Sequence, residues 1–294
     1  MRYRIRTVAA AHYDDAAPFG RHLLRVKPRG DMGQILHEAA LEIAPSPGEH
    51  EDGVDFFGNS ATWLTIERPH ESFVVRTSAQ VTVPFAPETP ADATPRCDVL
   101  RAEALTHASL DPLAPAHFLF ASRVVRPSDE ITAFASPSFA DDAPILSAAL
   151  HFMWRIHNEF AYDSDATDVD TRPEAAFAAR RGVCQDFAHV MIAGMRGLGL
   201  PAAYVSGFLR TLPPPGQPRL EGADATHAWV AVWCGAEIGW VGLDPTNDMR
   251  AGADHVIIAI GRDYADVAPE SGIVLTYGPQ RLDVAVDVAP SAEG

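Results

Sequence analysis

The sequence predicts an α+β fold in which an all-β N-terminal domain precedes a domain of helices packed on an antiparallel sheet. Short runs of β-branched residues separated by turn signals occupy residues 1–83. Helical periodicity then appears in residues 145–160 and 184–196, and strand-like runs return after residue 202. With 294 residues, 47% of them hydrophobic, the chain has the length of two domains and the composition of a globular protein.

The composition argues against several classes of function. A net charge of −16 and a pI near 5.0 disfavour nucleic acid as a partner, because phosphate binding requires clustered Lys and Arg. The sequence contains neither a secretory signal pattern nor the roughly 18 consecutive apolar residues of a membrane span. Three cysteines without framework spacing argue against a disulfide scaffold. We therefore expect a cytoplasmic protein with no membrane partner and with free thiols.

Residues 1–83 are predicted to form a β-sandwich-like domain. Five runs combine β-branched residues with partial alternation, and Gly, Pro, Asn and Asp mark the turns between them. Strands at this spacing favour an antiparallel sandwich or an open barrel. The predicted strands cover residues 2–7, 21–28, 36–44, 61–67 and 72–83.

Residues 84–144 are predicted to be a linker with a helical segment. The chain up to Pro95 is rich in Pro and Ala, residues 97–108 have helical character, and residues 110–140 have no clear pattern. Residues 145–268 are predicted to form the core of the second domain. Residues 269–294 are predicted to contain a C-terminal strand, at residues 282–288, and a tail.

The predicted core begins with two helices. Residues 145–160 carry apolar positions at helical spacing after a start signal at residues 141–144. A helix over residues 184–196 ends where Gly197, Gly199 and Pro201 interrupt it. Strands are expected at residues 203–209, 227–234 and 237–243, the last two as a hairpin that turns near Gly235.

Three residues at the ends of these elements suggest a thiol nucleophile with its base and an orienting carboxylate. Cys184 opens the second helix, His227 begins one strand, and Asp244 ends the next strand. A helix N-terminus and a nearby imidazole both favour a thiolate. The backbone N–H of the cysteine is then placed to help hold an oxyanion. A carboxylate beside the imidazole fixes its tautomer.

The spacing of His227 and Asp244 agrees with this arrangement. They stand at the outer ends of the strands 227–234 and 237–244, so a tight hairpin between these strands is predicted to place them side by side. Each residue alone has an ordinary explanation: an inert buried Cys184, a packed histidine, and a turn at Asp-Pro-Thr. Their occurrence together and in this order favours catalysis.

The segments around these residues resemble the transglutaminase-like core, a relative of the papain-type cysteine hydrolases. The resemblance is carried by Gly182-x-Cys184-x-Asp186-x-Ala188, Arg196-x-Leu198-Gly199-Leu200-Pro201-Ala202, Val205-Ser206-Gly207-Phe208, His227-Ala228-Trp229-Val230 and Trp240-Val241-x-Leu243-Asp244-Pro245-Thr246. More narrowly, the sequence resembles a bacterial branch of this family that has an extra N-terminal β domain. The segments that carry this resemblance are Cys184-Gln185-Asp186-Phe187-Ala188-His189, Gly261-Arg262-Asp263-Tyr264-Ala265-Asp266-Val267-Ala268-Pro269 and Asp55-x-Phe57-Gly58-Asn59.

The resemblance implies a papain/transglutaminase-like core in which Cys184 is the nucleophile, His227 the general base and Asp244 its orienter. It also implies an amide-bearing acyl donor, release of ammonia or an amine, and transfer of the acyl group to an amine or to water. The oxyanion donors would be the Cys184 backbone and Trp154, which lies upstream in the predicted helix 145–160, although core packing is the other interpretation of Trp154. Position 203 is Ala where the family often has Arg, so that contact is not expected here.

Other candidate sites are weaker. His189 lies off the face of Cys184 and is expected to be a helix-surface or core histidine. His151 and His157 lack a third ligand at zinc spacing. The acidic residues 163–174 resemble a calcium loop in length, but Asp168 stands at the sixth position, where Gly is needed. No metal or cofactor is therefore expected.

We expect a cysteine enzyme that transfers acyl groups from amide bonds of peptides or proteins, by hydrolysis or by transamidation to an amine. Hydrolysis is slightly favoured. One alternative is a non-catalytic module that binds peptides or proteins with the same fold, and another is an acyltransferase that uses a thioester donor. The oligomeric state and the role of the β domain stay open.

Overall fold

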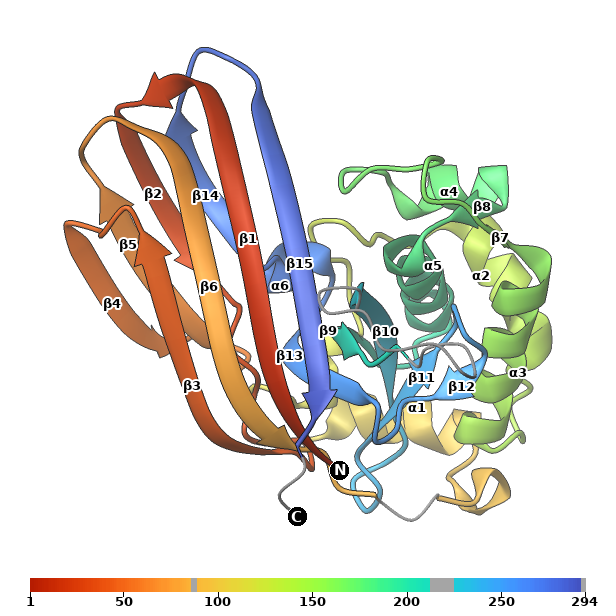
Figure 1. Cartoon of the computed structure of the whole chain (residues 1–294). Helices are drawn as coiled ribbons and strands as arrows, with labels where there is room; N and C mark the ends of the chain where they lie inside the picture. The colour runs from red at the N-terminus through yellow and green to blue at the C-terminus, as the bar shows by residue number, and fades with distance from the viewer. Residues whose placement is uncertain (86–88, 212–224, 292–294) are drawn as a thin grey trace, which may run out of the picture.

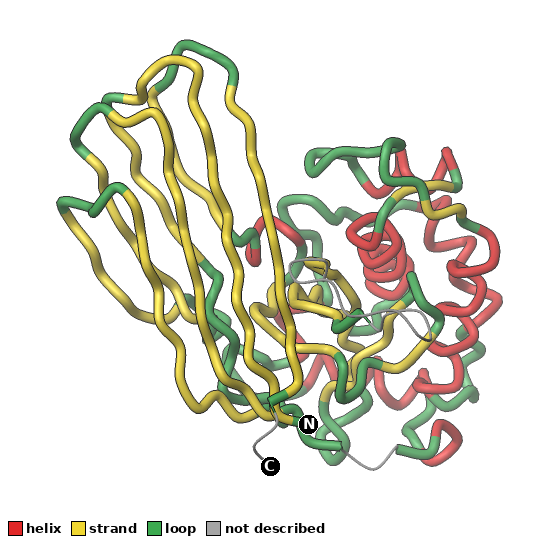
Figure 2. Tube along the Cα trace, viewed as in Figure 1, coloured by secondary structure: helices red, strands yellow, loops and turns green. Residues whose placement is uncertain are grey.

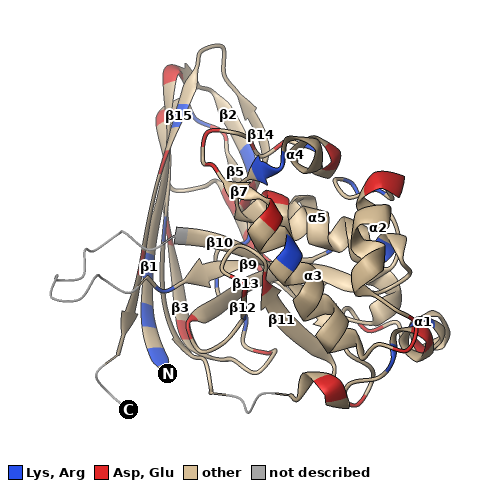
Figure 3. Ribbon diagram, turned by 90° about the vertical axis from the view of Figure 1, so that its right-hand side faces the viewer, with Lys and Arg blue, Asp and Glu red and all other residues tan. Residues whose placement is uncertain are grey.

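The computed structural model describes residues 1–85, 89–211 and 225–291, and consists of a long β sandwich beside a domain of helices and strands (Figures 1 and 2). This is the α+β architecture that the sequence predicts. Within the described chain, no helix has the length and apolar character needed to cross a membrane. Asp and Glu occur on both halves, with Lys and Arg among them (Figure 3).

Two four-stranded antiparallel sheets form the sandwich. The first has the strand order β15-β1-β6-β3, and the second has the order β14-β2-β5-β4. The strands that come from the N-terminal part of the chain are β1 Arg2–Ala17, β2 Phe19–Leu24, β3 Ile35–Ala44, β4 Glu49–Val54, β5 Ser60–Ile66 and β6 His70–Thr82. The five predicted strands are present, and β4 is an additional one. Every residue of β4 is exposed, so its sequence lacks the apolar alternation that reveals a half-buried strand.

The C-terminal residues complete both sheets. The strand β15, Gln280–Pro290, pairs with β1, and β14, Glu270–Leu275, pairs with β2. One strand was predicted here, at residues 282–288. The structure has two, because β14 is stabilised by pairing at the sheet edge and carries little burial pattern of its own.

The inner face of the first sheet packs on two different partners. At one end Ala11, Phe73 and Val75 pack on the second sheet. At the other end Ile5, Val81 and Val288 lie in a separate core cluster with side chains of the neighbouring domain, including Phe208, Val256 and Ile258. The first sheet is therefore both half of the sandwich and a wall of the second domain.

The second domain has a five-stranded antiparallel sheet with the order β12-β11-β10-β9-β13. Its strands are β9 Ala202–Leu209, β10 Ala225–Trp233, β11 Trp240–Asp244, β12 Met249–Arg250 and β13 His255–Gly261. Its helices are α1 Cys97–Thr106, α2 Asp129–Ala135, α3 Ile145–Glu159, α4 Pro173–Ala179, α5 Cys184–Gly197 and α6 Tyr264–Val267. Short elements are η1 Ala91–Ala93, η2 Pro115–Phe118, η3 Ser136–Ser138, β7 Ala161–Tyr162 and β8 Arg181–Gly182.

The helix α5 is the buried centre of this domain. Residues 185–196 of the helix are all buried. Its apolar side chains belong to one large cluster with those of α3 and of the strands β10 and β11. The chain that had no sequence pattern, residues 110–140, contributes α2, which contacts α5 directly. This packing fixes the position of the N-terminus of α5.

Candidate active site

Cys184 is the first residue of α5, and its side chain is partly exposed. In the same turn the Asp186 carboxylate accepts hydrogen bonds from the Val183 N–H (2.8 Å) and from the Thr167 hydroxyl (2.6 Å). Gly182 leaves room for this carboxylate, because a Cβ there would lie 2.5 Å from the Asp186 Oδ2. The start of the helix is therefore well defined, with the positive end of its dipole at the sulfur.

His227, on β10, lies between the other two members of the predicted triad. Its Nε2 lies 2.8 Å from the Asp244 Oδ2, which leaves Nδ1 for the Cys184 side chain. Only 7% of the imidazole side chain is exposed. Burial by itself lowers the pKa of His227, but the hydrogen bonds and charges of Asp244 and Cys184 outweigh burial and raise this pKa to about 9. The arrangement therefore favours an imidazolium at neutral pH.

Asp244 is completely buried and accepts hydrogen bonds at both oxygens. Its Oδ1 accepts from the backbone N–H groups of Thr246 (3.0 Å) and Asn247 (3.2 Å). Its Oδ2 accepts from His227, from the Asn247 amide (2.7 Å) and from the Nε2 of His255 (3.3 Å). Burial would raise the pKa of Asp244, but these bonds lower it overall, so the carboxylate stays ionised.

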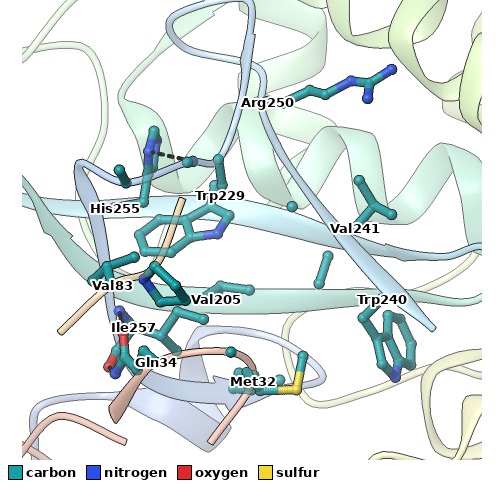
Figure 4. A pocket seen from close by; sticks show the side chains of 18 of the residues that line it. Met32, Gln34, Val83, Val205, Trp229, Trp240, Val241, Arg250, His255 and Ile257 are labelled. Atoms are coloured by element: carbon teal, nitrogen blue, oxygen red, sulfur yellow. Dashed lines mark hydrogen bonds between the residues drawn. The ribbon is translucent and has the colours of Figure 1, made fainter. Parts of the chain in front are cut away.

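His255 and Asn247 are functional-site residues that the sequence analysis missed. His255 begins β13, where the apolar run 256–260 is a recognisable strand signal, but nothing in the sequence indicates its partner. The ring lies edge-on to Trp229, with centroids 5.1 Å apart. Both residues line a cavity of about 340 Å³, and Figure 4 shows how they lie in it. Asn247 closes the turn that follows Asp244, and an Asx-type turn after Asp-Pro-Thr is the signal that would have found it.

The register that brings His227 and Asp244 together differs from the prediction. A tight turn was expected to place them directly opposite each other. Val230 pairs with Leu243 instead, so Asp244 lies opposite Trp229, two positions further along β10. Because side chains alternate with a period of two, this shift keeps both residues on the same face.

The turn itself explains the shift in register. The connection spans residues 234–239, longer than the tight turn that was expected. Gly235 and Gly239 both have positive φ, and the Gly239 N–H donates to the Gly235 carbonyl. This wider turn needs glycine at both positions, since other residues rarely adopt such a backbone.

Cys184 and His227 open into a cavity of about 410 Å³ between the two halves of the molecule. From the second domain it is lined by β9, β10, β13 and the start of α5. From the sandwich it is lined by the middle of β1 and by side chains of β15. A volume of this size is typical of ligand sites.

The cluster of His227, Asp244 and His255 was also considered as a metal site. Within the described residues it is the one group of three or more His, Cys, Asp and Glu whose ligand atoms all lie within 4.8 Å of one another. The Gly252 N–H donates to the Nδ1 of His255 (3.2 Å), so the ring proton is on Nε2, which faces Asp244. A metal ligand needs a free lone pair at that nitrogen. The hydrogen bonds therefore do not fit a metal.

The structure does not bring Trp154 to the site. Its side chain is 51% exposed on α3 and stacks on His151, with ring centroids 6.1 Å apart. Among the described residues that line the cavity around Cys184, Trp154 is absent. The reason is its place on α3, whose buried side is formed by Phe152, Met153 and Ile156 instead.

The weaker candidates have local partners. His189 is fully buried, and its Nε2 accepts from the Tyr264 N–H (3.2 Å); burial lowers the pKa of His189 to about 4, so the ring is neutral. In the acidic segment Asp163 pairs with Arg181 at 3.5 Å. His151 hydrogen bonds with the Ser138 hydroxyl, and His157 hydrogen bonds with the Thr246 carbonyl. Ala203 packs in the apolar cluster around Trp229.

Residues 132–245 match the family model of the transglutaminase-like superfamily, and residues 3–82 match that of the bacterial transglutaminase-like N-terminal region. An uncharacterized protein of Mycobacterium tuberculosis is 35% identical over 295 residues, which cover 98% of this chain and 93% of the relative. A protein-glutamine gamma-glutamyltransferase of Pseudomonas aeruginosa is 37% identical over 93 residues, 31% of this chain and 14% of that enzyme.

A crystal structure of a Cytophaga hutchinsonii protein, described there as a proposed cysteine protease, has the same fold. The TM-score is 0.75 at 23% sequence identity, and the match covers 98% of this chain and 90% of the other. The similarity therefore includes the sandwich as well as the domain that carries Cys184.

Proposed function

Because the chain belongs to the transglutaminase-like superfamily, we propose that it is a cysteine enzyme acting on amide bonds of peptides or proteins through a thioester at Cys184. One observation carries the proposal above all others. His227 is hydrogen-bonded to the buried carboxylate of Asp244, interacts with Cys184, and lines with it a cavity large enough for a ligand. A site that only binds peptides has no chemical need for this combination.

The proposed reaction begins with proton transfer from Cys184 to His227. The proton of the Cys184 thiol moves to Nδ1 of His227, and the Asp244 carboxylate stabilises the resulting positive charge from Nε2. The dipole of α5 favours the negative charge on sulfur. His255 and Asn247 hold the carboxylate in place.

The sulfur then attacks the carbonyl carbon of the amide. The S–C bond forms, and the carbonyl oxygen becomes an oxyanion that accepts a hydrogen bond from the backbone N–H of Cys184. When this intermediate collapses, the C–N bond breaks and the imidazolium gives its proton to the departing nitrogen. Ammonia or an amine leaves, and the acyl group stays on Cys184 as a thioester.

The second half of the reaction transfers the acyl group to water or to an amine. His227 removes a proton from the acceptor, the new C–O or C–N bond forms, and the thiolate leaves. We favour hydrolysis, because Cys184 is partly exposed and water can therefore reach the thioester. An amine acceptor would use the same steps.

The proposed partners are a peptide or protein that supplies the amide and, for transamidation, an amine. We propose the cytoplasm as the place of action. Cys97, Cys184 and Cys234 are all free in the structure, and a reducing compartment keeps a reactive thiol available. The acidic net charge of −16 speaks against nucleic acid as a partner.

The first test is alkylation of the native protein with iodoacetamide over a range of pH, followed by mass spectrometry. Burial raises the pKa of Cys97 to about 11 and that of Cys234 to about 12, so both are slow internal controls. We expect Cys184 to react faster than both controls at neutral pH and to react about tenfold more slowly in His227→Ala.

Turnover is tested separately. Ammonia release from glutamine-containing peptides should stop in Cys184→Ala while the protein stays folded. Activity with acyl thioesters but not with amides would indicate an acyltransferase that uses a thioester donor. Ordinary reactivity of Cys184, unchanged in His227→Ala, would refute the catalytic proposal and favour a binding module.

A further inference from the structure

The first sandwich sheet loses its regular burial where it passes the cavity. In β1, buried and exposed residues alternate from Tyr3 to Arg6 and again from Ala11 to Tyr13, whereas residues 7–10 are all half-buried. On β15, the side chains of Leu282 and Val284 are 61% and 53% exposed, although they continue the face on which Val286 is buried. The apolar inner face is thus uncovered at the gap between the second sheet and the second domain.

These exposed side chains belong to the cavity that contains the reactive cysteine. Leu282 and Val284 line it together with Cys184 and His227. Val284 pairs with Ala9, and Leu282 pairs with Ala11, so small side chains stand beside the two larger ones. The result is a shallow apolar wall that faces the site.

The charged groups of the cavity are already paired. Arg25 has its Nε 2.7 Å from Asp55, and both side chains are 11% exposed. Glu270 lies 2.7 Å from the Nδ1 of His22, which is buried. The cavity therefore offers apolar surface to a ligand, and these two charged groups already have hydrogen-bond partners.

We propose that Leu282, Val284 and Ala9 form a subsite for an apolar side chain that lies next to the reacting amide of the acyl donor. The proposal rests on the proposed function, because it assigns the donor to the same cavity. Binding an apolar side chain here removes both its own surface and the exposed faces of Leu282 and Val284 from water. A charged side chain of the donor at this place would lose its hydration without gaining an oppositely charged or hydrogen-bonding group.

Capture of peptide probes by Cys184 tests the subsite without requiring turnover. The probes are acetylated tripeptide amides in which the middle side chain carries a chloroacetamide and the two flanking residues are both Leu, both Lys or both Glu. The sulfur forms a bond with the methylene carbon, and chloride leaves. Rates are followed by mass spectrometry and divided by the rate with iodoacetamide. We expect the Leu probe to react about tenfold faster than the Lys and Glu probes.

Two variants on the same strand localise the effect. Val284→Glu places a charge in the proposed subsite, and Ala285→Glu places the same charge one residue away, on the other face of the sheet and outside the cavity lining. Both positions are exposed, so both variants should fold as the wild type does, which a thermal melt checks. Val284→Glu should slow capture of the Leu probe about tenfold. Ala285→Glu should leave both this rate and the labelling of Cys184 by iodoacetamide unchanged.

The outcomes separate the subsite from the proposed function. Equal rates with the three probes, or equal rates in Val284→Glu and the wild type, would overturn the subsite even if glutamine peptides are turned over. A strong preference for the Leu probe that Val284→Glu removes would support the subsite. If the same wild-type protein then released neither ammonia nor an amine from a Leu-flanked glutamine peptide, the proposed function would fail, while the preference of the cavity for apolar side chains would stand.

Discussion

Asp244 is held by five hydrogen bonds, two from backbone N–H groups and three from side chains. A carboxylate with no exposed surface is tolerated only when it is paired in this way. Each donor therefore has two effects, since it stabilises the fold and it fixes the atom to which His227 is anchored. His255 and Asn247 are the side-chain donors that sequence analysis did not identify, and the effect of His255 can be isolated.

Replacing His255 with Phe should slow the chemistry of Cys184 more than it harms the fold. The ring can still pack edge-on against Trp229, but the bond to Asp244 is lost. A hydrogen bond to a charged group contributes about 1.5–3 kcal/mol, so we expect alkylation of Cys184 at neutral pH to slow by about tenfold. His255→Gln, which can again donate to the carboxylate, is the matched control and should recover part of the rate. An alkylation rate in His255→Phe equal to that of the wild type would show that His255 only packs.

The raised pKa of His227 predicts how stability depends on pH. Because its pKa is about 9 in the folded protein and 6.5 ordinarily, the contribution of His227 to the unfolding free energy is complete below pH 6.5. It is lost as the pH rises through 9 and amounts to at most a few kcal/mol. Urea unfolding of the wild type and of His227→Gln, at pH 6.5 and above pH 9, measures it. The two proteins should differ in stability much more at the lower pH. A difference that does not change with pH contradicts the ionised pair.

Among individual residues, the sequence analysis identified those that stand in recognisable catalytic motifs. It missed those that only the folded sheet brings to the site. Cys184, His227 and Asp244 stand in recognisable motifs at element ends, and the structure brings all three together. His255 lies beyond Asp244 on another strand, and only the folding of the sheet places its Nε2 against the carboxylate. The prediction that Trp154 lies at the site was wrong. The number of residues between Trp154 and Cys184 does not determine on which side of α3 the Trp154 side chain lies.

The start of α5 depends on the close fit between Gly182 and Asp186. The carboxylate crosses the space that a side chain at residue 182 would occupy, and it accepts from the Val183 N–H. Gly182 also belongs to β8, which pairs with β7, so the backbone on this side has little freedom to move. The conformation of Cys184 thus depends on the absence of a side chain at Gly182.

Gly182→Ala should therefore disturb both stability and reactivity. The new Cβ would lie 2.5 Å from the Asp186 Oδ2 and 2.8 Å from two of its carbons, so the carboxylate must leave its position. Overpacking of this kind costs about 1–3 kcal/mol. The thermal unfolding temperature and the alkylation rate of Cys184 should both fall. Gly48→Ala, whose nearest atom would be 3.8 Å away, is the control and should change neither. An unaffected rate in Gly182→Ala would mean that this fit does not position the sulfur.

Helices and strands were predictable from the sequence where one buried face produces a regular spacing of apolar residues. The helices α3 and α5 and the strands β5 and β9 have apolar faces, and they occur where they were expected. The strand β1 extends to Ala17, beyond the predicted end at residue 7, because pairing with β6 and β15 outweighs the low strand propensity of its alanines. The hairpin between β10 and β11 shows the same limit, since its register follows from the turn rather than from the strands.

The whole molecule is joined by the face of the first sandwich sheet that covers the second domain. Ile5 and Val288 pair across β1 and β15, and both are completely buried with Phe208 and Val256 of the second domain. The strand β15 reaches this contact only after the chain has passed through the second domain. Neither half therefore has a complete core from one continuous stretch of sequence, although the two family models match separate segments.

This shared core predicts that the two halves unfold together. Ile5→Ala removes a fully buried side chain from the shared core cluster and should cost about 2–5 kcal/mol. The fluorescence difference between each protein and its Trp63→Phe variant reports on the sandwich, because Trp63 lies on β5 and the other four tryptophans lie in the second domain. Far-UV circular dichroism of the helices reports on the second domain. Because the core is common, both signals should shift to the same lower temperature in a single transition. Ile273→Ala, at a position 65% exposed on β14, should leave the transition where it is. If Ile5→Ala moved the sandwich signal alone, the halves would be independent, and the cavity between them would lack a fixed wall.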